Sequence, residues 1–124
     1  MKYSCTIKNI EEEYDVTIQI NNLVLVGLDY FGISEKEIGK KKWVEIELFD
    51  EIKIVPAQKN IKNIKRVGDS FSYVITGILD INKSSIHSLI DFDLSPNILF
   101  DYGYLDQKYI DLKILRMDFS FTDK

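Results

Sequence analysis

The chain has 124 residues, of which 20 are acidic and 16 basic, and it carries a formal net charge of -4 with a pI near 5.0. Its length fits one ordinary domain, and its 45% hydrophobic content is ample for a packed core, which excludes an intrinsically disordered chain. The negative charge opposes non-specific attraction of the whole molecule to nucleic-acid phosphates or anionic lipid.

Cysteine usage and the lack of long apolar runs bear on location. Cys5 is the only cysteine, so an intramolecular disulfide is impossible and a reducing compartment fits. The N-terminal residues lack the apolar stretch of a secretory signal, and no run approaches the roughly 18 apolar residues that a membrane span needs. We therefore expect a cytoplasmic protein with no membrane partner.

Apolar and polar side chains alternate along the N-terminal part of the chain, which predicts strands with one buried face. The residues expected on the buried face of the first two strands are Tyr3, Cys5, Ile7, Val16, Ile18 and Ile20. The pair Asn21-Asn22 interrupts the pattern before an apolar run at residues 23–26. This run predicts burial on both faces or a bulge at the asparagines.

The middle of the chain mixes helix and strand patterns. Residues 33–39 predict a single helical turn, with Ser34 as the N-cap and Glu37 as its capping-box partner. Apolar residues keep one parity over 44–54, which predicts one long bent strand or two consecutive strands. The spacing becomes helical at residues 57–67, where we expect a short amphipathic helix.

The C-terminal half returns to strand patterns. Residues 71–81 alternate, with Gly77 at a core-facing position, where a glycine often marks strand coiling or close approach of another backbone. Residues 86–94 predict a further strand, with a helix as the alternative. A serine-proline pair then starts a short helix over 96–102, which Gly103 ends.

Residues 109–121 give the longest strand signal, and their apolar parity switches near Leu115-Arg116, as in a strand that crosses a curved sheet at a bulge. Long bent strands, bulge signals, an interior glycine and short helices between strands together predict a mainly β fold. We expect residues 1–124 to form a single-domain antiparallel barrel, OB-like in topology, with one to three short helices. A β-sandwich is the alternative.

Catalytic signatures are sparse. His87 is the only histidine, and on a single strand it would share a face with Leu89, Asp91 and Asp93, which resembles a weak metal site. Alternation alone also predicts polar residues there, so we assign no metal. Cys5 has the apolar parity of a core thiol, and phosphate loops, zinc spacings and nucleophile elbows are absent. We expect no catalytic residue, no cofactor and no enzymatic activity, with a metal-dependent enzyme as the second alternative.

Two basic clusters stand out in the acidic chain: Lys40-Lys41-Lys42, and the group Lys59, Lys62, Lys65 and Arg66. On an OB-like barrel they would supply the groove of a single-stranded nucleic-acid-binding protein, with Trp43 and Tyr73 as its stacking platform. This alternative assigns nucleic-acid contacts to Lys41, Lys42, Trp43, Lys62, Lys65 and Arg66. Lysines also solubilise loops, and the net charge favours that simpler explanation.

Five aspartates and five aromatic residues are interleaved between residues 91 and 111. Some of the aromatics belong to the core, but their density leaves room for an exposed acidic patch that carries tyrosines. Exposed aromatic side chains can anchor an interface, and the negative charge of the aspartates around them favours fast recognition of a basic protein. We assign protein binding to Asp91, Asp93, Asp101, Tyr102, Tyr104, Asp106 and Asp111.

The combined pattern predicts a small acidic binding protein of inhibitor or immunity type, which neutralises a basic toxin or nuclease by occluding it. An OB-like single-stranded nucleic-acid-binding protein is the alternative. The sequence leaves the identity of the partner and the oligomeric state open.

Overall fold

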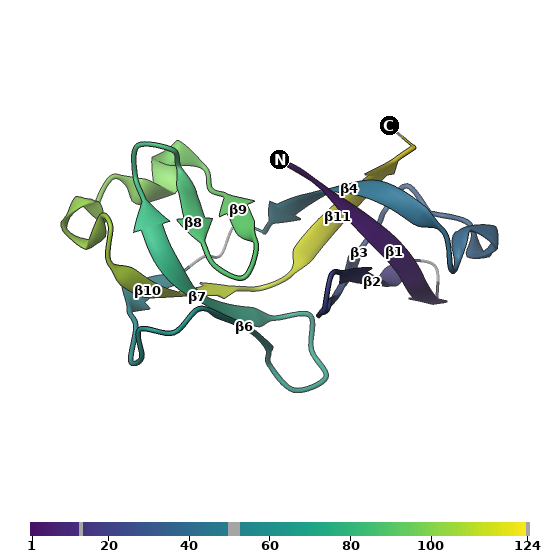
Figure 1. Ribbon diagram of the computed structural model, residues 1–124, viewed down its shortest axis with the longest axis horizontal. Helices are drawn as coiled ribbons and strands as arrows, with labels where there is room; N and C mark the ends of the chain where they lie inside the picture. The colour runs from purple at the N-terminus through teal and green to yellow at the C-terminus, as the bar shows by residue number, and fades with distance from the viewer. Residues whose placement is uncertain (13, 50–52, 124) are drawn as a thin grey trace. The chain divides into compact units, whose positions relative to one another are not determined.

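The computed structural model describes residues 1–12, 14–49 and 53–123 and confirms the mainly β fold, with three short 3₁₀ helices in these ranges (Figure 1). The chain divides into two compact units, Met1–Glu47 with Arg116–Lys124, and Leu48–Leu115. The first contains a closed barrel and the second a six-stranded sheet. The single domain stays a prediction, because this division does not show whether either unit folds alone.

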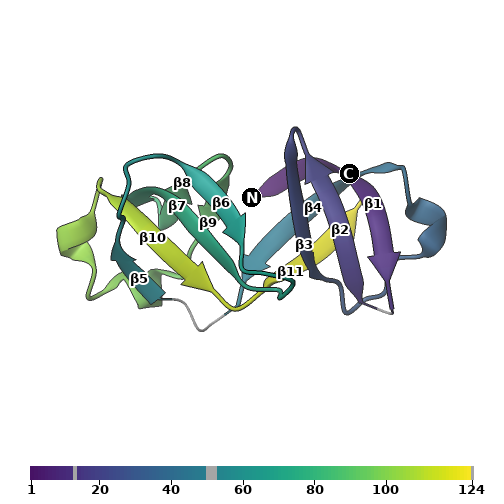
Figure 2. The ribbon, with the colours of Figure 1, turned by 90° about the horizontal axis from the view of Figure 1, so that it is seen from below.

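Five strands close the barrel: β1 (Lys2–Glu11), β2 (Asp15–Ile20), β3 (Leu23–Leu28), β4 (Lys41–Leu48) and β11 (Met117–Thr122). They follow one another in the order β1-β2-β3-β11-β4, and β4 pairs with β1 to complete the ring (Figure 2). The predicted barrel is therefore confirmed. It is mixed rather than wholly antiparallel, because β11 runs parallel to β3. A closed ring of five strands whose last strand enters between earlier ones is of the OB-like, Greek-key kind.

Alternating side chains fill the barrel interior. The following residues are at most 3% exposed: Cys5, Ile7, Val16, Ile18, Leu25, Val44, Met117 and Phe119. The predicted buried parity of the first two strands is thus confirmed, although Tyr3 is only half-buried. Gly27 makes room for the Phe119 ring, since a Cβ at Gly27 would lie 2.6 Å from it.

The apolar run after the asparagine pair faces the barrel interior on one side only. β2 and β3 form a tight hairpin in which Ile20 pairs with Leu23, without a bulge, and Asn21 has a φ of 54°. Val24 is 53% exposed, so the prediction of burial on both faces is wrong. Only alternate residues of a barrel strand point inward, and an apolar neighbour does not change that geometry.

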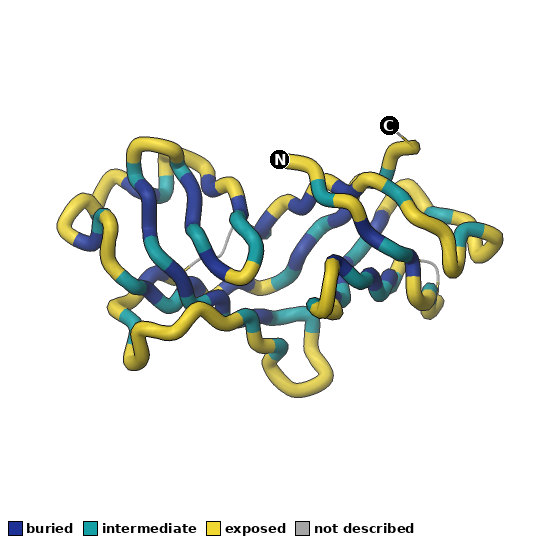
Figure 3. The backbone as a smooth tube through the Cα atoms, viewed as in Figure 1, coloured by how far each residue is buried: buried dark blue, intermediate teal, exposed yellow. Residues whose placement is uncertain are grey.

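The second unit is an antiparallel sheet. Its strands lie in the order β5 (Lys53–Pro56), β10 (Tyr109–Ile114), β7 (Tyr73–Asp80), β8 (Ser85–His87) and β9 (Asp91–Asp93), and β6 (Asn63–Arg66) pairs with the first half of β7. Buried and more exposed positions alternate along β7 (Figure 3). The close backbone approach predicted at Gly77 is confirmed, because a Cβ there would meet the His87 carbonyl oxygen and lie 2.9 Å from its carbon.

The helix predicted over residues 57–67 is wrong. Residues 63–66 form β6, in which Ile64 pairs with Ile75 of β7, and Ile61 is 67% exposed. A helical spacing of three apolar residues is a weak signal. The hydrogen bonds that β7 offers along its open edge outweigh it.

The strand predicted over residues 86–94 is a hairpin. Ile86 of β8 and Phe92 of β9 pair directly and are both buried, and residues 88–90 turn the chain between them. Both residues lie on the core side of their strands. The alternating pattern therefore continues through the turn, which is why it predicted a single strand.

The helix predicted over residues 96–102 is shorter in the structure and ends at a different residue. The 3₁₀ helix η2 covers Pro96–Leu99, with the predicted proline at its start but no hydrogen bond from the Ser95 side chain. Gly103 does not end it but begins a second 3₁₀ helix, η3 (Gly103–Leu105).

Three other predictions hold in part. Residues 44–54 form two consecutive strands, β4 and β5, although Ile52 lies outside the described residues. The parity switch near Leu115-Arg116 separates β10 from β11, where the chain passes from one unit to the other. The helical turn is η1 (Glu35–Glu37), and the Ser34 side chain caps it by accepting from Lys36 N rather than from Glu37 N.

No helix within the described residues combines the length and the apolar character needed to cross a bilayer.

Candidate functional site

The 3₁₀ helices η2 and η3 present a loop, residues 100–104, that we call the aromatic loop. Leu99 and Leu105, each 4% exposed, anchor its two ends in the core. Between them Phe100 is 83% exposed and Tyr104 is 65% exposed, whereas Tyr102 is half-buried. The structure therefore leaves two large aromatic rings in contact with solvent.

Hydrogen bonds hold the aromatic loop to β7 and to the turn that follows it. Before the loop, Leu94 N donates to Ser84 O at 2.7 Å. After it, Gln107 N donates to Leu79 O at 2.7 Å, and the Asp106 carboxylate accepts from Ile81 N at 2.9 Å. Because both flanks are tied to the sheet, the loop is held in place before any partner arrives.

The segment around the loop is strongly acidic. Residues 91–106 contain four aspartates and neither lysine nor arginine, so their formal charge equals the -4 of the whole chain. Asp93 and Asp101 are exposed, whereas Asp106 is half-buried and accepts the hydrogen bond from Ile81 N. Of the seven residues assigned to protein binding, Asp101, Tyr102 and Tyr104 lie together in the loop and Asp106 supports it.

Asp111 lies apart from the aromatic loop. It sits on β10, where it pairs in register with Thr76 of β7, and its carboxylate accepts a hydrogen bond of 2.6 Å from the Thr76 hydroxyl. Sequence proximity placed it with the other aspartates, but the strand carries it to a different part of the sheet.

His87 is held by two carboxylates. Its Nε2 lies 3.0 Å from Asp80 Oδ2 and its Nδ1 lies 3.1 Å from Asp91 Oδ1, which is its partner across the β8–β9 hairpin. Leu89 is in the turn, 56% exposed, and not on a strand with His87 as predicted. Within the described residues no group of three or more His, Cys, Asp or Glu side chains is arranged to hold a metal ion.

The carboxylates shift the titration of the imidazole. Hydrogen bonding to Asp80 raises the pKa of His87 above its ordinary 6.5, with a smaller contribution from Asp91 and an opposing one from burial. The same hydrogen bond, with one from Lys83 N, lowers the pKa of Asp80 below its ordinary 3.8. When it is protonated, the imidazole can donate to Asp80 of β7 and to Asp91 of β9, and so ties β7 to the β8–β9 hairpin.

The residues of the nucleic-acid alternative belong to two different units. Trp43, 42% exposed, and the exposed Lys41 lie on β4 of the barrel. Arg66 belongs to the second unit and donates from Nε to Ser70 O at 2.7 Å, which closes the β6–β7 turn. Lys62 and Lys65 line a cavity in that same unit.

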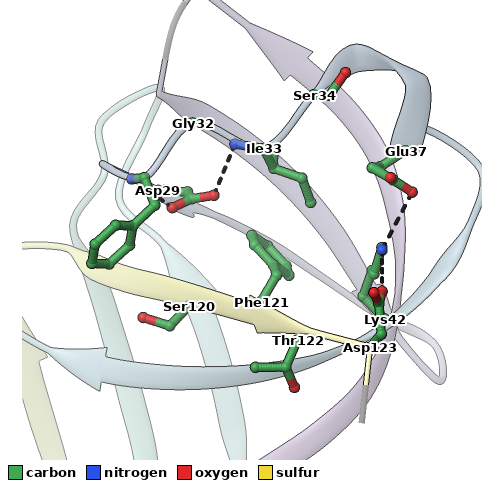
Figure 4. Close-up of a pocket in the computed structure, with 11 residues that line it drawn as sticks. Asp29, Gly32, Ile33, Ser34, Glu37, Lys42, Ser120, Phe121, Thr122 and Asp123 are labelled. Atoms are coloured by element: carbon green, nitrogen blue, oxygen red, sulfur yellow. Dashed lines mark hydrogen bonds and ion pairs between the residues drawn. The ribbon is translucent and has the colours of Figure 1, made fainter.

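A cavity of about 400 Å³ opens beside the barrel strands β4 and β11 (Figure 4). Lys42 points into it, but its ammonium group pairs with Asp123 and with Glu37, the latter at 3.4 Å. Asp29 in the same wall accepts hydrogen bonds from Phe31 N and Ile33 N and so shapes the loop. Because these charges are already satisfied within the protein, this cavity offers a ligand little to bind.

Sequence reasoning left two residues out of the candidate sites. Phe100 is more exposed than either assigned tyrosine, and Lys59 shares a cavity with Lys62 and Lys65. The sequence feature that could have indicated an exposed Phe100 is its position between Leu99 and Asp101, outside any run of alternating apolar and polar residues.

Comparison with known proteins gives a family but no further relative. No curated protein and no solved structure matches the chain. A family model matches residues 1–122, which is nearly the whole sequence. The chain therefore belongs to the family described as Uncharacterised conserved protein UCP019853.

Proposed function

We propose that this is a non-enzymatic binding protein that docks onto a basic partner protein through the aromatic loop. The observation that carries the proposal is the exposure of Phe100 (83%) and Tyr104 (65%) on a loop with buried ends. A few large aromatic side chains supply most of the energy of many protein interfaces. Because the flanks of the loop are fixed, ordering it on binding costs little conformational entropy.

Charge defines the partner. The four aspartates of residues 91–106, with no basic residue among them, create a local negative field. Such a field accelerates encounter with a basic protein and disfavours acidic ones. A basic toxin or nuclease in the cytoplasm is the partner class that fits an inhibitor or immunity role. The pairing of both His87 ring nitrogens with carboxylates supports a structural rather than catalytic role for the only histidine.

Affinity capture with matched baits tests the proposal. The baits are the wild type, the double variant Phe100→Ala with Tyr104→Ala, and the control Phe31→Ala, which removes a ring that is 89% exposed in the barrel unit. We expect the wild type and the control to capture the same basic protein from the native host, and the double variant to lose it. Equal capture by all three baits would show that the aromatic loop is not the interface.

Kinetics with the purified partner test the charge argument. Asp101 is exposed and makes no contribution to the core, so Asp101→Lys leaves folding intact. We expect it to lower the association rate constant severalfold at low ionic strength and much less at high salt. An unchanged association rate at low salt contradicts electrostatic recognition.

A further inference from the structure

The second sheet has a basic face, although the chain as a whole is acidic. Strand register places residues in rows across β6, β7, β10 and β5, and residues paired in register point to the same side. One row consists of Lys65, Val74, Lys113 and Lys53. The next consists of Asn63, Thr76, Asp111 and Val55. The face opposite the buried Tyr73 and Ile75 therefore carries three lysines within one row.

A cavity of about 490 Å³ lies over this face. Its lining includes Lys59, Lys62, Lys65, Val74, Thr76 and Asp111. The segment before β6 supplies Lys59 and Lys62, whereas Val74 and Thr76 belong to β7. Sites for small molecules have volumes of roughly 300–1,000 Å³, and this cavity falls within that range.

The charges that line the cavity are positive in excess. Three lysines against one aspartate give a local formal charge of +2 in a chain whose total is -4. Within the described residues none of these lysines forms an ion pair, in contrast to Lys42 of the barrel. Three exposed ammonium groups around one space attract a ligand with more than one negative charge.

The remaining lining residues narrow the ligand class. Ile61, 67% exposed, and the half-buried Val74 give the cavity an apolar part. The Asp111 carboxylate, oriented by the Thr76 hydroxyl, is an acceptor for a ligand hydroxyl or amino group. The lining contains no aromatic side chain on which successive bases of a nucleic acid would stack.

We propose that this cavity binds a small phosphorylated molecule with a hydroxyl-bearing or amino-bearing organic part, of the nucleotide type. The lysines hold the phosphates, Asp111 accepts a hydrogen bond from the organic part, and Ile61 with Val74 packs against it. The site is separate from the aromatic loop, and the two proposals stand or fall independently.

Calorimetric titration with ATP, inorganic pyrophosphate and citrate at low ionic strength tests the inference. The cavity variant is Lys59→Gln with Lys65→Gln, and the matched control is Lys8→Gln with Lys36→Gln, which removes two exposed lysines of the barrel unit. We expect ATP to saturate the wild type and the control with equal affinity. The cavity variant should bind ATP at least about tenfold more weakly, since a hydrogen bond to a charged group contributes about 1.5 kcal/mol or more.

Asp111→Asn separates the two parts of the site. Removing the negative charge should strengthen pyrophosphate binding, and ATP should gain less because a neutral amide oxygen accepts its hydrogen bond more weakly than the carboxylate does. Failure of ATP to bind, or equal ATP affinity in the cavity variant, would overturn the inference. Citrate that binds as tightly as ATP overturns the phosphate assignment. An oligothymidylate that binds more tightly than ATP, and loses binding in the same variant, replaces it with a nucleic-acid site.

Discussion

Replacing Gly77 by alanine tests the packing that shapes the second sheet. An added Cβ would meet the His87 carbonyl oxygen and lie 2.9 Å from the carbonyl carbon and 3.0 Å from Ser88 Cβ. The nearest atoms are backbone, so no flexible side chain can move aside. The Ser88 hydroxyl also donates to Thr76 O at 2.7 Å, which holds this part of the β8–β9 turn against β7.

The cost follows from these contacts. Overpacking a core position by one methyl group destabilises by roughly 1–3 kcal/mol, and contact with fixed backbone places Gly77→Ala at about 3 kcal/mol. With an unfolding entropy of about 2.1 cal/mol/K per residue, that loss lowers Tm by about 10 °C if the whole chain unfolds together. The shift is larger if the second unit unfolds alone.

Thermal and urea unfolding followed by circular dichroism measure the effect. Gly103→Ala is the matched control, because a Cβ there meets nothing within 4 Å and its φ is not positive. We expect this control to change stability by less than about 0.5 kcal/mol or to stabilise slightly. If Gly77→Ala loses less than about 1 kcal/mol, the backbones of β7 and β8 do not approach as described and the reasoning fails.

Three further predictions concern single side chains. The raised pKa of His87 stabilises the fold fully below about pH 6.5, and this stabilisation is lost as pH rises through the raised pKa. The urea midpoint of the wild type should therefore exceed that of His87→Gln by more at about pH 5 than at about pH 9. A difference that does not change with pH contradicts the pairing. Leu99→Ala should lower the free energy of unfolding by about 2–5 kcal/mol, whereas Phe100→Ala should change it by less than about 0.5 kcal/mol. Similar losses for the two variants would contradict the burial of Leu99 and the exposure of Phe100. Burial raises the pKa of Cys5 to about 11, so iodoacetamide at neutral pH should label the thiol only after denaturation, and rapid labelling of native protein would refute its place in the core.

Alternation predicted the strands well because burial on one face is a local property of the chain. The inward positions of β1, β2 and β4 follow from two-residue spacing alone, and Gly77 stood out because a core-facing position lacked a side chain. The same reasoning failed where pairing between distant segments decided the outcome. The edge of β7 made a strand of residues 63–66, and the Ile86–Phe92 pair made a hairpin of a pattern that fits one strand equally well.

The candidate sites were harder to predict, because the sequence shows the type of each residue but not which strands pair or in which register. Lys65 was assigned to nucleic-acid contacts and Asp111 to protein binding, yet β7 lies between their strands and both line one cavity. By contrast, Asp101 and Tyr104 stay together, since a short loop keeps sequence neighbours close in space. Local clusters on loops therefore survive folding, and clusters spread over strands are redistributed by pairing.

The second unit carries acidic and basic surfaces at once, which affects how binding data must be interpreted. The aromatic loop and the lysine-lined cavity both belong to residues 48–115, and the net charge of -4 averages over them. Added salt weakens the binding of a basic protein and of a phosphorylated ligand alike, so salt dependence cannot distinguish the two sites. Charge substitutions can, because Asp101→Lys removes attraction for a basic partner, whereas Lys59→Gln with Lys65→Gln removes attraction only for an anion.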